Sequence, residues 1–139
     1  MRDQMNQLHI KRAISPVSVA DNTAQTGEVV DLQGFDACTF VIATGSLGDA
    51  DATFAVEVQE CDTSGGSYTA VADANLVGTE ALAGFQFDSD NACRKIGYVG
   101  SKRYVKLVIT PSGNASAALI AAVAVLGHPA KSPTSNPPA

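Results

Sequence analysis

The sequence has no tryptophan, and its 139 residues include only 3 cysteines and 2 histidines. An odd number of cysteines without a Cys-X-X-Cys pair argues against a disulfide framework and against a zinc site. Cys38, Cys61 and Cys93 lie in strand-like runs, so we expect buried free thiols. His9 and His128 lie near the two ends of the chain, which argues against a Ser-His-Asp hydrolase. We therefore expect no enzymatic activity, no catalytic residues, no bound metal and no cofactor.

Long apolar segments are also missing. No apolar run reaches the ~18 residues of a membrane-spanning helix, and the N-terminus lacks the apolar core of a signal peptide. We therefore expect no membrane partner and synthesis in the host cytoplasm. Residues 49–51 and 88–91 (Asp-Ala-Asp and Asp-Ser-Asp-Asn) place oxygen atoms close together, as calcium ligands require, but neither has the glycine and glutamate of an EF-hand. Ordinary turn residues are the simpler interpretation.

Two long segments of the chain each lack charged residues of one sign. Residues 13–93 contain 13 Asp or Glu and no Lys or Arg, whereas residues 94–139 contain six Lys or Arg and no acid. The formal net charge of −5 argues against a nucleic-acid partner. Two interpretations of the segregation remain open. In the first, the basic stretch lies beside acidic strands of its own fold. In the second, acidic and basic patches meet between subunits.

The middle of the chain consists of short β-rich runs separated by turn residues. Strands that recur at intervals of roughly ten residues predict an all-β fold, an antiparallel β-sandwich. We divide the chain into an N-terminal arm (1–12), a sandwich domain (13–127) and a Pro-rich C-terminal tail (128–139). The expected first strand, 13–20, contains Pro16, which predicts a position at a sheet edge.

Residues 92–110 predict a β-hairpin that turns at Gly100-Ser101. The expected core face of this hairpin holds four side chains: Ile96, Val105, Leu107 and Ile109. The other face would place Lys95 opposite Lys106, an arrangement of like charges that costs some tenths of a kcal/mol. We therefore expect acidic groups to lie against that face.

The last apolar run, 115–126, is compatible with a helix or a strand. Its β-branched residues Ile120, Val123 and Val125 favour a strand. Both faces of such a strand would be apolar and small. We therefore expect it to be central in a sheet or covered by another subunit.

Three stretches carry a resemblance to a known family: Asp36–Glu60, Arg94–Thr110 and Ala122–Pro129. The second reads Arg-Lys-Ile-Gly-Tyr-Val-Gly-Ser-Lys-Arg-Tyr-Val-Lys-Leu-Val-Ile-Thr, and the third reads Ala-Val-Ala-Val-Leu-Gly-His-Pro. Together the stretches resemble small virion proteins of tailed bacteriophages and prophages, which are typically encoded near the major capsid protein. The resemblance implies a structural, head-associated role and a sandwich that is jelly-roll-like.

The resemblance leads us to expect a capsid cement or decoration protein on the outer surface of the virion. Such a protein would bridge neighbouring major capsid protein subunits and would act as a homodimer or homotrimer. The residues expected to bind these partners are Leu8, Ile10, Lys11, Arg12, Lys95, Lys102, Tyr104, Lys106, Pro129, Pro133 and Pro137. Two alternatives remain open. One is a head–tail connector or tail component; the other is a carbohydrate-binding or host-adhesion module, against which the scarcity of aromatic residues argues.

Overall fold

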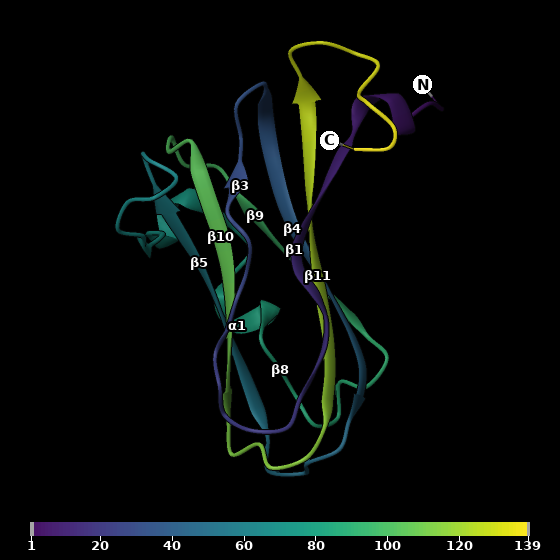
Figure 1. Cartoon of the computed structure of the whole chain (residues 1–139), viewed down its shortest axis with the longest axis vertical. Coiled ribbons are helices and arrows are strands. Elements are labelled where there is room, and N and C mark those ends of the chain that lie inside the picture. Colours follow the sequence, from purple (N-terminus) through teal and green to yellow (C-terminus); the bar gives the residue numbers. More distant parts are fainter. Residues whose placement is uncertain (1, 139) are drawn as a thin grey trace.

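The computed structural model describes residues 2–138, which form two antiparallel β-sheets packed face to face (Figure 1). Sheet A has the strand order β1-β11-β4-β9-β7. Its strands are His9–Val19, Ala118–Pro129, Phe35–Leu47, Cys93–Tyr98 and Leu76–Val77. In sheet B, β10 (Tyr104–Ser112) pairs with β5 (Thr53–Cys61). Four two-residue strands complete sheet B: β2 (Gln25–Thr26), β3 (Val30–Asp31), β6 (Thr69–Ala70) and β8 (Phe85–Gln86).

The order of the strands is that of a jelly roll. Strands β2 and β3 both pair with β10, so they act as one interrupted strand. The first long strand, β1, lies beside the last, β11, and the chain crosses between the sheets at most of its long connections. This double wrapping defines the jelly-roll form of the sandwich. The predicted all-β, jelly-roll-like fold is therefore confirmed.

The core lies between the two sheets and follows from the alternation in their strands. Phe40 and Ile42 of β4 face Phe54 and Val58 of β5, and all four are at most 2% exposed. Phe85 stacks on Phe54 with ring centroids 4.8 Å apart. Burying each such side chain contributes about 1.5–3 kcal/mol. The period-two pattern of the sequence therefore becomes the inner layer of the fold.

The predicted hairpin over residues 92–110 is wrong, although its four core side chains are indeed buried. Strand β9 pairs with β4 in sheet A, whereas β10 pairs with β5 in sheet B. A two-residue turn cannot span the ~10 Å between packed sheets. The connection instead wraps around Tyr98, whose hydroxyl donates to Glu60 Oε2 (2.6 Å) and accepts from the Lys102 backbone N–H (3.0 Å). As a result, Lys95 lies opposite Val41 and Lys106 opposite Gln59, not opposite each other.

Strand β1 is an edge strand, as Pro16 predicted, and its register with β11 is irregular around that proline. It begins at His9, which is buried and stacks on Phe35 with centroids 5.2 Å apart. The expected boundary between arm and sandwich at residue 12 therefore falls inside a strand. The run 115–126 contributes most of β11, which is central between β1 and β4, so the strand interpretation is confirmed.

Two short 3-10 helices, Met5–Gln7 and Asp73–Asn75, and one α-helix, α1 (Glu80–Ala83), complete the structure. The Thr79 hydroxyl caps α1 by accepting from the Leu82 N–H at 3.0 Å. Within residues 2–138, no helix is long and apolar enough to cross a membrane.

The three free thiols differ in exposure, which corrects the expectation that all are buried. Cys38 is buried, Cys61 is half-buried and Cys93 is exposed. Burial raises the pKa of the Cys38 thiol to about 12, so at neutral pH it holds almost no thiolate, the reactive form. In a thiol-labelling time course at pH 8, we expect Cys93 to react first and Cys38 only after denaturation. Rapid modification of Cys38 in the folded protein would contradict the described packing of β4.

Candidate functional site

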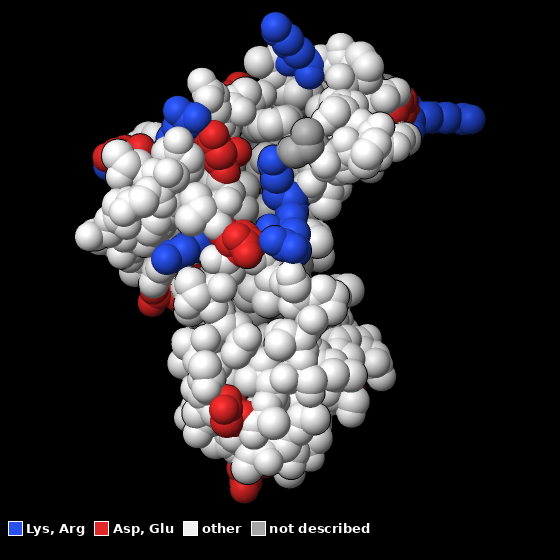
Figure 2. Space-filling view, viewed as in Figure 1, with Lys and Arg blue, Asp and Glu red and all other residues white. Residues whose placement is uncertain are grey.

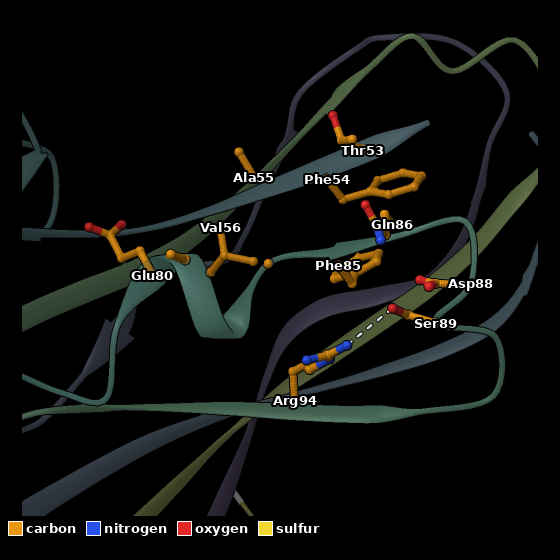
Figure 3. A pocket seen from close by; sticks show the side chains of 12 residues that line it. Thr53, Phe54, Ala55, Val56, Glu80, Phe85, Gln86, Asp88, Ser89 and Arg94 are labelled. Carbon is orange, nitrogen blue, oxygen red and sulfur yellow. Dashed lines mark hydrogen bonds between the residues drawn. The ribbon is translucent and has the colours of Figure 1, made fainter. Parts of the chain in front are cut away.

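A pocket opens where α1 and β8 lie across one side of the sandwich (Figure 3). Helix α1 contacts both β5 and β9, and the pocket beside it has a volume of about 660 Å³. The lining includes Thr53, Phe54, Glu80, Phe85, Gln86, Asp88, Ser89 and Arg94. No sequence pattern predicts this pocket, because its lining residues come from separate segments of the chain (53–56, 80–89 and 94).

Three polar side chains of the pocket, those of Glu80, Ser89 and Arg94, are already hydrogen-bonded inside the fold. Glu80 Oε2 accepts from the Val58 N–H at 3.0 Å, and burial raises the pKa of the Glu80 carboxyl group. Arg94 donates to Ser89 Oγ at 3.1 Å (Figure 3). Phe54 and Phe85 are buried against each other, so their faces are not open to a ligand. The pocket can accept a small polar molecule, but it offers no aromatic platform.

A second candidate surface is the solvent-facing side of sheet A, which we call the outer face. Because opposite residues in an antiparallel pair point to the same side, the registers define its rows. One row reads Arg12, Val123, Val41 and Lys95 across β1, β11, β4 and β9. The adjacent rows add Ile10, Val125, Thr39 and Gly97 on one side, and Ala121, Ala43 and Cys93 on the other. The two basic side chains flank a small aliphatic centre, and these rows contain no acid.

In the described part of the chain, Lys102, Arg12 and Arg103 each form an ion pair with an acid. Lys102 Nζ lies 2.7 Å from Asp62, and Arg12 Nη2 lies 3.4 Å from Glu28. Arg103 binds Asp31 through two hydrogen bonds of 2.8 Å. For these residues the structure supports the first interpretation of the charge segregation, in which basic groups lie beside acidic strands of the same fold.

The Arg103–Asp31 pair predicts a pH-dependent contribution to stability. The Arg103 guanidinium lowers the pKa of Asp31 below its ordinary value of 3.8. A carboxyl group with a depressed folded-state pKa stabilises the fold above its ordinary pKa, and that contribution is lost as the pH falls through the folded value. Because both side chains are nearly half exposed, we expect Asp31→Asn to cost less than about 1 kcal/mol at pH 7. Urea unfolding should show this difference shrinking towards pH 2; an equal difference at both pH values would contradict the assignment.

Charge is also segregated along the length of the molecule. The loops farthest from the termini (20–24, 48–52, 87–92 and 113–117) contain no Lys or Arg. We call this the acidic end; its acids are Asp21, Asp49, Asp51, Asp88 and Asp90. The opposite end, which we call the basic end, carries Arg2, Lys102, Arg103 and Lys131 together with Asp3, Asp31 and Asp62. Lys102 and Arg103 are paired with Asp62 and Asp31, so Arg2 and Lys131 supply its remaining exposed positive charge. On the face shown in Figure 2, blue and red side chains lie together in the upper part, and only red ones lie at the lower end.

Aspartates at the acidic end stabilise its loops by accepting hydrogen bonds from backbone N–H groups. Asp49 accepts from the N–H groups of Asp51 (2.9 Å) and Ala115 (2.8 Å), and Asp90 accepts from the Leu47 N–H at 2.9 Å. Among the described residues, no group of three or more His, Cys, Asp or Glu is placed to hold a metal ion. These contacts are those of turn residues, the simpler of the two interpretations considered for the loops.

The two chain ends meet at the basic end (Figure 1). The Thr134 N–H donates to Asn6 O at 3.0 Å, and its hydroxyl donates to Leu8 O. The Ala130 N–H also donates to Gly34 O at 2.8 Å. The segments 2–8 and 130–138 therefore form one composite surface, which we call the terminal cluster.

The expected partner-binding residues do not form one surface. Ile10, Arg12 and Lys95 lie on the outer face of sheet A, and Tyr104 and Lys106 lie on the solvent side of sheet B. At or near the basic end lie Leu8, Lys11, Lys102, Pro129, Pro133 and Pro137. None of the expected residues lies at the centre of the outer face. The sequence signal for that centre is the apolar character of both faces of β11.

No protein-family model matches the sequence, and no curated protein matches it significantly. The chain is similar to the CBM22-1–GH10 modules of Clostridium thermocellum xylanase 10B in complex with xylohexaose. That match has 10% identity and a TM-score of 0.42, and it covers 95% of this chain but 28% of the other. The C-terminal family 22 carbohydrate-binding module of the same xylanase gives 11% identity, coverage of 92% and 91%, and a TM-score of 0.36. The infectious bursal disease virus VP2 subviral particle gives 9% identity and a TM-score of 0.33, and the match covers 87% of this chain and 40% of that one. Likeness at this level carries no argument about function.

Proposed function

We propose that this protein is a capsid cement or decoration protein that binds the outside of an assembled bacteriophage head. The observation that carries the proposal is the polarity of the molecule. Both chain ends lie at the basic end, and five aspartates occupy the loops of the opposite end. A block with exposed aspartates at one end and Arg2 and Lys131 at the other can join patches of opposite charge on neighbouring subunits, where charge fixes the register and accelerates association.

The terminal cluster is the part that would contact the major capsid protein. Its exposed residues, such as Pro133 and Pro137, lie outside the sandwich core, so they can bind a neighbour without disturbing it. A protein that binds only the assembled lattice stabilises that lattice by mass action. Many copies on one shell make a modest single contact sufficient.

Co-sedimentation with purified expanded heads tests this proposal. We expect the double variant Arg2→Glu/Lys131→Glu to reduce head binding at least tenfold at 0.15 M salt. The control Glu57→Lys reverses a charge in the middle of the β5–β10 ladder, away from both ends, and should still bind. Equal binding by the wild type and the Arg2→Glu/Lys131→Glu variant would refute a head contact made by the terminal cluster.

Carbohydrate binding is the second candidate, and one observation favours it. The solvent side of sheet B brings two half-buried tyrosines, Tyr68 and Tyr104, near Glu57 and Gln59. Aromatic faces with nearby carboxylate and amide groups are suited to sugar binding. However, Lys106 already lies 4.4 Å from the centroid of Tyr68, and Arg103 lies 4.9 Å from that of Tyr104.

A glycan-array screen tests this candidate directly. If it is right, the wild type should bind a defined set of glycans, and Tyr68→Ala/Tyr104→Ala should lose them. The variant Phe87→Ala, which removes an exposed ring elsewhere, should still bind. Absence of any glycan signal from the wild type would reject this candidate.

A further inference from the structure

We propose that a cleft at the basic end of the sandwich binds a carboxylate group, which on the head would be an acidic side chain of a major capsid subunit. The cleft is separate from the pocket beside α1 and from the outer face of sheet A. The identity of the partner rests on the proposed function, whereas the binding of a carboxylate can be tested without heads. Three features of the cleft support this assignment: its walls, its charge and its unused hydrogen-bond donors.

The cleft lies between β1, the end of β3 and the C-terminal segment, and its volume is about 330 Å³. His9 and Lys11 form the β1 wall. Their partners on β11 are fully buried, so both side chains point to the inner side of sheet A. Residues 131–135 form another wall, which Thr134 fastens to the N-terminal segment by hydrogen bonds to Asn6 O and Leu8 O. The cleft is therefore built from segments that are distant in the chain.

The cleft carries more positive than negative charge. Its lining acid is Asp31, which binds Arg103 through two hydrogen bonds of 2.8 Å. The hydrogen bond from Arg103 lowers the pKa of Asp31, and the charge of Lys11 lowers it further. Lys131 adds a third cation and forms no ion pair within residues 2–138. Three cations therefore accompany one carboxylate, which leaves room for an added anion.

His9 and Gln33 supply hydrogen-bond donors that the fold does not use. The His9 ring is 6% exposed and stacks on Phe35, yet its nitrogens make no hydrogen bond within residues 2–138. In that part of the chain, Asn114 Oδ1 is the only fully enclosed side-chain atom without a partner, so the His9 nitrogens are accessible from the cleft that the ring lines. Gln33 Oε1 accepts from Arg103 at 2.7 Å, which leaves the amide NH₂ group as a second donor. A buried polar group without a partner in the fold indicates one outside it.

These groups fit a carboxylate. Ammonium, imidazole and amide N–H groups donate, and a carboxylate accepts through both of its oxygens. A singly charged anion suits the cleft better than a phosphate dianion, because Asp31 repels each added negative charge. Among the described residues of the terminal cluster, the only acid is Asp3, whose carboxylate already accepts from Asn6 at 2.6 and 3.1 Å. The exposed Lys131 places the cleft within the surface that would meet the head.

Nuclear magnetic resonance titration of the isolated protein with the peptide acetyl-Gly-Glu-Gly-amide tests the site. At about 20 mM salt, where charges are weakly screened, we expect shifts at His9, Lys11 and Gln33 and a dissociation constant in the millimolar range. The matched peptide with Gln in place of Glu should cause no such shifts. Lys131→Gln should weaken binding at least about threefold, a loss typical of an exposed ion pair, and Lys131→Arg should keep it.

The control Lys106→Gln makes the same change on the solvent side of sheet B and should bind the Glu peptide as the wild type does. Lys11→Gln should also weaken binding; thermal unfolding shows whether this variant is folded, and the exposed Lys131 gives a test that leaves the core intact. No binding at about 50 mM Glu peptide, equal binding of the Gln peptide, unchanged binding by Lys131→Gln or tighter binding of inorganic phosphate would overturn the proposal. Peptide binding by a protein that does not bind heads would retain the site and reject the proposed function. Head binding without peptide binding would do the reverse.

Discussion

Replacing Phe40 with alanine is expected to lower the free energy of unfolding by about 3–5 kcal/mol. Phe40 is fully buried in β4, the strand that lies between β11 and β9. Loss of the phenyl ring leaves a cavity between the two sheets. Interstrand hydrogen bonds hold the backbones of both sheets in place, so neighbouring side chains cannot move in to fill the cavity. Because small domains are stable by only about 5–15 kcal/mol, this change should remove a large part of the total. Urea or guanidinium unfolding followed by circular dichroism measures the effect.

The matched control for this prediction is Phe87→Ala. Phe87 is 44% exposed and lies in the loop after β8, so we expect its loss to cost less than about 1 kcal/mol. Equal effects of the two substitutions would show that Phe40 does not lie in a packed core. They would also contradict the assignment of the inner layer of sheet A.

Replacing Gly27 with alanine is expected to destabilise the protein by about 1–3 kcal/mol, a cost typical of an overpacked site. A Cβ atom at this position would lie 2.7 Å from the backbone oxygen of Leu107 and 2.9 Å from that of Ala13. Both oxygens belong to long strands, β10 and β1, so neither can move away easily. The Gly27 N–H also donates to Leu107 O at 2.7 Å, which fixes the connection to the edge of sheet B.

Gly65 provides the comparison for Gly27. It lies in the loop between β5 and β6, and a Cβ atom there would have no neighbour within 4 Å. Gly65→Ala should therefore leave the unfolding midpoint almost unchanged. If Gly27→Ala were as harmless as Gly65→Ala, the close approach of β1 and β10 around residue 27 would be incorrect.

The sequence was informative wherever one face of a strand is apolar and the other is polar. The alternation of Phe54, Val56 and Val58 with polar residues placed β5 and its core face correctly. Pro16 marked an edge because it cannot donate to a ladder. These signals are local, so a single strand contains enough information to read them.

The predicted hairpin failed because strand pairing in a jelly roll is not local. Residues on both sides of Gly100-Ser101 have strand character, and nothing in their composition shows that they enter different sheets. The side chain that decides the path is Tyr98, which occupies the crossing and binds Glu60 from a strand far away in the chain. Such a contact is visible only after β5 and β9 have been placed.

The candidate surfaces were harder to predict than the fold. Expected partner-binding residues were chosen for charge and for their place at the chain ends, and the structure distributes them over both sheets and the basic end. Strand β11 carried a useful signal, because a strand that is apolar on both faces needs a cover on both. Sheet B covers its inner face, and Val123 and Val125 on the outer face remain accessible to a partner.

The jelly roll itself does not decide between a virion protein and a sugar-binding module, because both kinds of protein use it. The proposed function therefore depends on the surfaces: exposed charges of opposite sign at the two ends, a terminal cluster and an apolar outer face. We expect each of these surfaces to contact other protein subunits. The carbohydrate alternative depends on two tyrosines whose rings already carry cations.

Cryo-electron microscopy of purified phage particles, with quantitative mass spectrometry of the same sample, tests the central claim most directly. The account predicts hundreds of copies on the outer surface of the head, with the terminal cluster seated at joints between major capsid subunits. A single ring of about a dozen copies at the portal or in the tail would contradict it. So would particles that lack the protein altogether.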